Sequence, residues 1–116
     1  MDEKRKSVRK YLYNYSKVFD EDTRRISGRL VNLTHDGMML MTDKPVEQET
    51  PLRFRMALPE GIGVTEQRSI TFDGTCRWCK KAYNPDYYDV GFEFTNVPDN
   101  SRGTIEYLMR FHSFNY

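Results

Sequence analysis

Residues 70–78, with the sequence ITFDGTCRW, have the alternating pattern of a long β-strand. Polar residues alternate here with small or apolar ones, which are Ile70, Phe72, Gly74, Cys76 and Trp78. Successive side chains of a β-strand point to opposite faces, so residues two apart share a face. The alternation therefore predicts a long strand with one buried face, and it places Trp78 at least half in the core.

Five other stretches also have the composition of strands. Residues 52–58 and 90–94 alternate in the same way, and their expected inward residues are Leu52, Phe54, Met56, Leu58, Val90, Phe92 and Phe94. Residues 11–19, about 26–33 and 38–41 are rich in aromatic or aliphatic side chains and predict three earlier strands. Polar connections that contain glycine or proline separate several of these strands.

The end of the chain changes to a helical period. Residues expected on one helical stripe are Ile105, Leu108, Met109 and His112, and residues able to cap the helix are Asp99, Asn100 and Ser101. The prediction is a helix over about residues 99–114. Six strands followed by one helix indicate an all-β fold with a C-terminal helix, in which the helix plugs or flanks a six-stranded antiparallel β-barrel.

The chain is expected to form a single domain over residues 1–116. It has 116 residues, of which 38% are hydrophobic and 30% charged, as suits a small soluble domain with a modest core. Within it, residues 1–10 are nearly free of apolar side chains and predict a flexible arm. The barrel is expected over about residues 11–95, and the helix over about residues 99–114.

No run approaches the roughly 18 apolar residues of a membrane span. No apolar stretch follows the N-terminal charges, so we expect a cytoplasmic protein rather than a secreted one.

Charge is distributed unevenly along a nearly neutral chain. The net charge is +1, but Lys and Arg gather at residues 4–10, 24–25 and 80–81. Local basic patches of this kind fit a discrete anion site better than a long nucleic-acid track.

The sequence contains no recognisable catalytic or metal-binding cluster. Cys76 and Cys79 form a single C-x-x-C pair, whereas a structural zinc site needs about four ligands. A spacing of three along a strand puts the two side chains on opposite faces, so we expect reduced thiols. His35 and His112 fall on different elements, and no nucleophile is paired with a base. We therefore expect no enzyme, no metal and no cofactor.

Two short segments have complementary chemistry. Residues 5–9 (RKSVR) place Arg5 and Arg9 four apart, and residues 32–37 (NLTHDG) form an N-x-T-x-x-G at a predicted turn between strands. The arginines supply two forked cations, while the turn supplies small polar groups around a glycine. Gly37 allows either a positive φ or a close backbone approach. Together the segments suggest a receptor for a small, planar, doubly anionic ligand.

The order of four motifs resembles the PilZ domain family along nearly the whole chain. The motifs are R-x-x-x-R at residues 5–9, N-x-T-x-x-G at 32–37, GTCRW at 74–78 and GFEF at 91–94. The resemblance implies a PilZ or split-barrel-like fold and binding of the bacterial second messenger cyclic di-GMP. Thr34 departs from the serine that is usual in the family, and Asn32 is a permitted variant of aspartate.

The resemblance also implies which residues bind the ligand. They are Arg5, Arg9, Asn32, Thr34, Gly37 and Trp78, with Lys4 and Lys6 as further cations. Guanidinium groups fork onto phosphate oxygens or onto guanine O6 and N7, whereas lysine supplies only a point charge. We expect the ligand to dock the arm onto the barrel, and an unidentified effector protein to read the change. The processes that such a receptor would regulate are motility, attachment, exopolysaccharide production or virulence. We expect the protein to be a monomer or a weak dimer.

Three alternatives remain open at this stage. One is a PilZ-like adaptor that has lost nucleotide binding and acts only through protein contacts, which Thr34 favours and the intact arginine pair opposes. A second is a barrel that binds single-stranded nucleic acid, for which binding would depend steeply on salt. A third, weaker one is a flavin-binding split-barrel enzyme.

Overall fold

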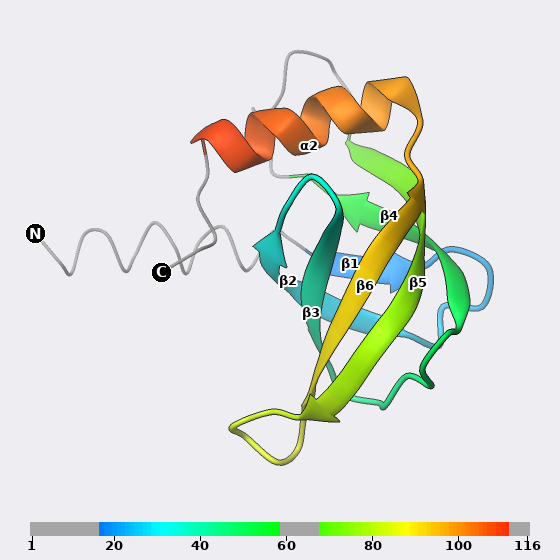
Figure 1. Cartoon of the computed structure of the whole chain (residues 1–116), viewed down its shortest axis with the longest axis vertical. Coiled ribbons are helices and arrows are strands. Elements are labelled where there is room, and N and C mark those ends of the chain that lie inside the picture. Colours follow the sequence, from blue (N-terminus) through cyan, green and yellow to red (C-terminus); the bar gives the residue numbers. More distant parts are fainter. Residues whose placement is uncertain (1–16, 59–67, 112–116) are drawn as a thin grey trace, which may run out of the picture.

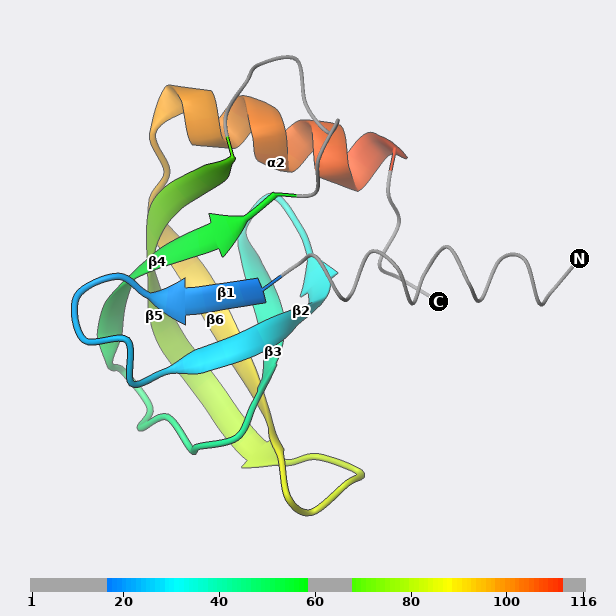
Figure 2. The ribbon, with the colours of Figure 1, turned by 180° about the vertical axis from the view of Figure 1, so that it is seen from behind.

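Within the residues that the computed structural model describes, 17–58 and 68–111, six strands close into an antiparallel barrel (Figure 1). The elements are β1 (Lys17–Asp20), β2 (Ser27–Leu33), β3 (Gly37–Thr42), β4 (Pro51–Ala57), β5 (Ser69–Lys81), β6 (Tyr88–Asn96) and α2 (Asp99–Phe111). The strand order around the barrel is β1-β2-β3-β6-β5-β4, and β1 closes it between β2 and β4 (Figure 2). The predicted six-stranded barrel with a C-terminal helix is confirmed. The arm, and residues 11–16 of the first predicted strand, lie outside the described residues.

Aromatic residues from three neighbouring strands fill the centre of the barrel. The ring of Phe54 in β4 lies 5.9 Å from that of Phe72 in β5 and 4.8 Å from that of Phe92 in β6, and Phe72 is 5.1 Å from Phe94. Phe54 and Phe72 are fully buried, and burial of such a side chain stabilises a fold by about 1.5–3 kcal/mol. The inward faces predicted for β4 and β6 are therefore correct.

A β-bulge in β5 overturns two of the predictions. The pairing of β5 with β6 shifts register between Cys76 and Trp78, so the alternation that holds from Ile70 to Cys76 breaks there. Trp78 lies on the outer face with 41% of its surface exposed, and it is not part of the core cluster. The prediction that it continues the buried face of β5 into the core is therefore wrong. Cys79 packs against the core beside buried Cys76, so the two thiols do not lie on opposite faces. Both are free cysteines, as expected, and burial raises the pKa of the Cys76 thiol.

The helix α2 lies across one end of the barrel (Figure 1). Ile105 and Leu108 are buried and Met109 packs against the core, which confirms three members of the predicted stripe, while His112 lies outside the described residues. The hydroxyl of Ser101 donates a hydrogen bond of 2.7 Å to the carbonyl of Thr71 in β5, so Ser101 fastens the helix to the barrel. In the part of the chain that the structure describes, no helix is long and apolar enough to cross a membrane.

A buried carboxylate organises the β1–β2 connection. Asp20 is 1% exposed and accepts hydrogen bonds from the N–H groups of Asp22 at 3.1 Å and Thr23 at 2.9 Å, and from the Thr23 hydroxyl. Burial alone would raise the pKa of Asp20, but these hydrogen bonds to the ionised form outweigh it and hold the pKa below its ordinary value. The ionised carboxylate is therefore part of the folded structure.

The stability of the protein is expected to fall in acid because of Asp20. Its pKa is lower in the folded state, so its contribution is present above the unfolded pKa of about 3.9 and is lost as the pH falls through the folded pKa. Asp20→Asn should lower the free energy of unfolding at pH 7 by about 1–3 kcal/mol relative to the wild type. On going from pH 7 to pH 3, the free energy of unfolding should then fall less in Asp20→Asn than in the wild type. Urea unfolding at both pH values measures this. If the free energy of unfolding falls equally in both proteins between pH 7 and pH 3, the role given to Asp20 is contradicted.

Candidate functional site

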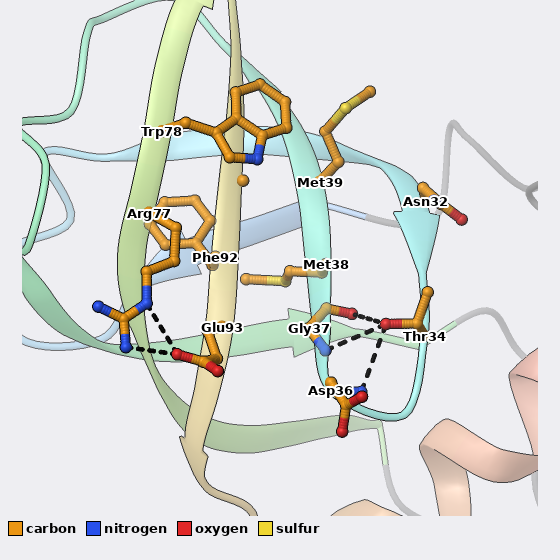
Figure 3. Close-up of a pocket in the computed structure, with 11 residues that line it drawn as sticks. Asn32, Thr34, Asp36, Gly37, Met38, Met39, Arg77, Trp78, Phe92 and Glu93 are labelled. Carbon is orange, nitrogen blue, oxygen red and sulfur yellow. Dashed lines mark hydrogen bonds and ion pairs between the residues drawn. The ribbon is translucent and has the colours of Figure 1, made fainter.

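An open pocket of about 370 Å³ lies on the outside of the barrel, where the β2–β3 turn meets β5 and β6 (Figure 3). Its lining residues are Asn32, Thr34, Asp36, Gly37, Met38, Met39, Arg77, Trp78, Gly91, Phe92 and Glu93. They come from three segments that are far apart in the sequence. The register of β3 against β6 and of β6 against β5 brings these segments together.

The hydroxyl of Thr34 shapes the turn at one end of the pocket. Thr34 Oγ1 accepts hydrogen bonds from the N–H groups of Asp36 at 3.3 Å and Gly37 at 3.2 Å, and it donates to the Gly37 carbonyl at 3.3 Å. The N–H of Thr34 donates to the same carbonyl at 2.9 Å. A serine would provide the same hydroxyl, so the turn accepts either residue.

Gly37 is required by a close approach of two backbones. A Cβ at this position would lie 2.2 Å from the carbonyl oxygen of Phe92 in β6. The φ of Gly37 lies outside the left-handed region, so of its two predicted roles close approach is the one observed. The carbonyl of Asp36 also accepts a 2.8 Å hydrogen bond from the N–H of Phe94, which fixes the turn to β6.

Trp78 lies at the other end of the pocket (Figure 3). Its partner in the pairing of β5 with β6 is Gly91, and the indole ring packs over that glycine. A Cβ on Gly91 would lie 2.2 Å from the Nε1 atom of the indole and 2.3 Å from its Cε2 atom. The bulge in β5 turns Trp78 outward. Because Gly91 has no side chain, the indole ring can pack directly against the backbone of β6. Lys80 Nζ lies 5.5 Å from the centroid of the ring. The result is a flat, partly exposed aromatic surface with a cation beside it.

An ion-pair network forms the wall of the pocket between these ends. Arg77 Nε donates to Glu93 Oε1 at 2.7 Å, its Nη2 contacts the same oxygen, and its Nη1 donates to Glu49 Oε1 at 2.7 Å. These hydrogen bonds, with Glu93 first and Glu49 second, raise the pKa of Arg77. Glu93 is thus neutralised by a guanidinium rather than left facing an incoming ligand.

Comparison with known proteins gives the family. The sequence matches the family model described as the PilZ domain over residues 3–111. The chain belongs to the PilZ family. A solved PilZ structure with a similar fold is the inhibitor of motility MotI/DgrA from Bacillus subtilis, with a TM-score of 0.60 and 14% identity. The match covers 82% of this chain and 45% of that one, so this PilZ domain spans less than half of the other protein's length. None of the curated proteins matches the sequence.

The PilZ domain brings together four of the residues predicted for its site. Asn32, Thr34, Gly37 and Trp78 all line the one pocket. The other four, Arg5, Arg9, Lys4 and Lys6, lie outside the described residues.

Sequence reasoning missed the other lining residues, which are Asp36, Met38, Met39, Arg77, Gly91, Phe92 and Glu93. Several of them stand inside or beside the quoted motifs. Arg77 and Glu93 carry opposite charges on the fifth and sixth strands, and opposite charges often pair across neighbouring strands. This pattern was a signal in the sequence that could have identified the two residues.

Gly91→Ala in this PilZ domain should displace the indole of Trp78. The added methyl group overlaps the ring, so the ring must leave β6, at a cost of about 1–3 kcal/mol in stability. Trp78 is the only tryptophan in the chain, so its fluorescence emission should shift to longer wavelength as the ring enters water. Gly103→Ala is the matched control, because a Cβ there meets nothing within 4 Å. An unchanged emission maximum in Gly91→Ala would rule out the packing of Trp78 on Gly91.

Proposed function

We propose that this PilZ domain is a receptor for cyclic di-GMP and that the pocket in Figure 3 is where the nucleotide binds. The observation that carries the proposal is the convergence of Asn32, the Thr34–Gly37 turn and Trp78 on one pocket. These residues belong to the motifs by which the sequence resembles cyclic di-GMP receptors. Nothing in the amino-acid spacing alone requires residues 32–37 and 78 to share a pocket, so their meeting supports the proposal.

The pocket has the chemistry that a purine dinucleotide needs. A guanine can stack on the exposed face of Trp78, and a base–aromatic stack contributes about 1–3 kcal/mol. The amide group of Asn32 offers hydrogen bonds at the edge of the pocket. The two phosphates require cations, which Arg5 and Arg9 of the arm supply in this proposal, with Lys4 and Lys6 adding positive charge.

The protein transmits the signal by docking its arm. Ligand binding orders residues 1–10 against the barrel, and the new surface changes contacts with an effector protein. Ordering the five residues 5–9, which contain both arginines, by itself costs up to about 5–10 kcal/mol, so the affinity is moderate and suits a switch. In this proposal the protein is a cytoplasmic receptor and not an enzyme, and it regulates motility, attachment, exopolysaccharide production or virulence.

Nuclear magnetic resonance tests where the ligand binds. Adding cyclic di-GMP should shift the indole N–H signal of Trp78 and the amide signals of Thr34 and Gly37. The amide signals of Gly28 and Tyr87, which line a different pocket, serve as the internal control. Shifts at Gly28 and Tyr87 with none at Trp78 would place the ligand elsewhere and overturn the assignment of the pocket.

One observation favours the second candidate, an adaptor that acts only through protein contacts. The hydroxyl of Thr34 already makes three hydrogen bonds within the turn, and the carbonyl oxygen of the Asn32 side chain accepts one from the N–H of Leu33 at 2.9 Å. Neither group therefore needs a ligand to be satisfied. An adaptor would bind its effector equally well with and without cyclic di-GMP, whereas binding by a receptor would change with the nucleotide. A pull-down of the effector in both conditions distinguishes the two candidates.

A further inference from the structure

The pocket contains one carboxylate that the fold positions but does not pair. Asp36 is exposed in the β2–β3 turn, and its main chain is held on both sides, by Thr34 Oγ1 at 3.3 Å and by the N–H of Phe94 at 2.8 Å. Within residues 17–58 and 68–111, no hydrogen bond or ion pair engages its side chain. Its carboxylate is therefore free to accept hydrogen bonds from a ligand.

The other polar side chains of the pocket that can accept hydrogen bonds already do so within the protein. The Asn32 carbonyl oxygen accepts from Leu33, which leaves the amide N–H groups of Asn32 as donors. The Thr34 hydroxyl accepts two hydrogen bonds and donates one within the turn. Glu93 is engaged by Arg77. Among the described lining residues, Asp36 is thus the strongest unused acceptor.

A carboxylate in the pocket of an anionic ligand needs a specific partner, because phosphate oxygens repel it. The Watson–Crick edge of guanine presents two neighbouring donors, the N1–H and the 2-amino group, which match the two oxygens of a carboxylate. Adenine has an acceptor at N1 and so lacks this pair. Hypoxanthine keeps the N1–H but has no 2-amino group. The carboxylate therefore distinguishes guanine from both other purines.

We propose, building on the proposed function, that Asp36 selects guanine by accepting hydrogen bonds from the N1–H and the 2-amino group of one base. Asp36 and Trp78 stand at opposite ends of the pocket (Figure 3). One guanine of the ligand then stacks on Trp78, while the edge of the other meets Asp36. The guanine preference of the protein arises at the turn, from a residue between Thr34 and Gly37 that the sequence motif leaves unspecified.

The test compares two ligands in two proteins by calorimetry. The ligands are cyclic di-GMP and cyclic di-IMP, in which hypoxanthine replaces each guanine. Asp36→Asn should weaken binding of cyclic di-GMP by about tenfold to a hundredfold, because an amide has one acceptor fewer and puts a donor against a donor. It should weaken cyclic di-IMP less, so the preference for cyclic di-GMP shrinks by about threefold to tenfold.

Asp43→Asn is the matched control, since exposed Asp43 follows β3 outside this pocket and loses the same charge. It should leave both affinities unchanged, and thermal unfolding verifies that both variants fold. If Asp36→Asn weakens both ligands equally, or strengthens cyclic di-GMP, the role of Asp36 is overturned while the proposed function stands. If the wild type binds neither ligand, the proposed function and this inference both fail.

Discussion

Arg5→Ala and Arg9→Ala are each expected to weaken cyclic di-GMP binding by about tenfold to a hundredfold or more, since each removes charge-assisted hydrogen bonds. Lysine cannot replace the fork of hydrogen bonds that a guanidinium makes to phosphate or to guanine O6 and N7. Arg9→Lys should therefore recover only part of the affinity. Calorimetric titration of the three variants measures the effect.

Thermal unfolding of the same variants separates binding from folding. The two arginines belong to the arm, which in this account joins the barrel only when ligand is present, so the unfolding temperature without ligand should barely change. Arg25→Ala, in the connection between β1 and β2, is a control that removes an exposed guanidinium away from the pocket. A similar loss of folding in Arg5→Ala and Arg9→Ala would contradict an arm that docks only on binding.

Gly37→Ala is expected to lower the free energy of unfolding by about 3 kcal/mol or more, at the upper end of what overpacking costs. Its Cβ would lie 2.2 Å from the carbonyl oxygen of Phe92, and this atom belongs to the backbone of β6, which cannot rotate away. The pairing of β3 with β6 must open for the methyl group to fit. Urea unfolding measures the loss.

The same substitution in the helix gives the comparison for Gly37→Ala. Gly103→Ala should raise the free energy of unfolding by about 0.5–1 kcal/mol, because alanine favours a helix over glycine and nothing lies within 4 Å of the new Cβ. Wild-type stability in Gly37→Ala would show that the contact between β3 and β6 is not as close as described. Glycine would then be needed at this position for ligand binding rather than for the packing of β3 against β6.

Local alternation predicted the barrel well because each strand needs one face against a single core. Phe54, Phe72 and Phe92 lie where the period of two places them. The prediction failed at Trp78 and Cys79, because the bulge in β5 depends on how β5 pairs with β6. Cross-strand register is not encoded in the alternation of one strand.

The candidate site was predictable only in part for the same reason. The motifs selected Asn32, Thr34, Gly37 and Trp78, and the structure places these four around one pocket. The ion pair of Arg77 with Glu93 depends on the register of β5 against β6, so no single segment predicts it. The availability of Asp36 depends on which neighbours are already hydrogen-bonded, and only the folded turn reveals that.

Calorimetric titration of the wild-type protein with cyclic di-GMP measures the proposed binding itself. A receptor should give a saturable heat of binding, with one or two nucleotides per protomer. Binding should depend weakly on salt compared with a nucleic-acid-binding barrel, which contacts many phosphates. No heat, together with no change in the amide and indole spectra at high micromolar nucleotide, would contradict the claim that this PilZ domain is a cyclic di-GMP receptor.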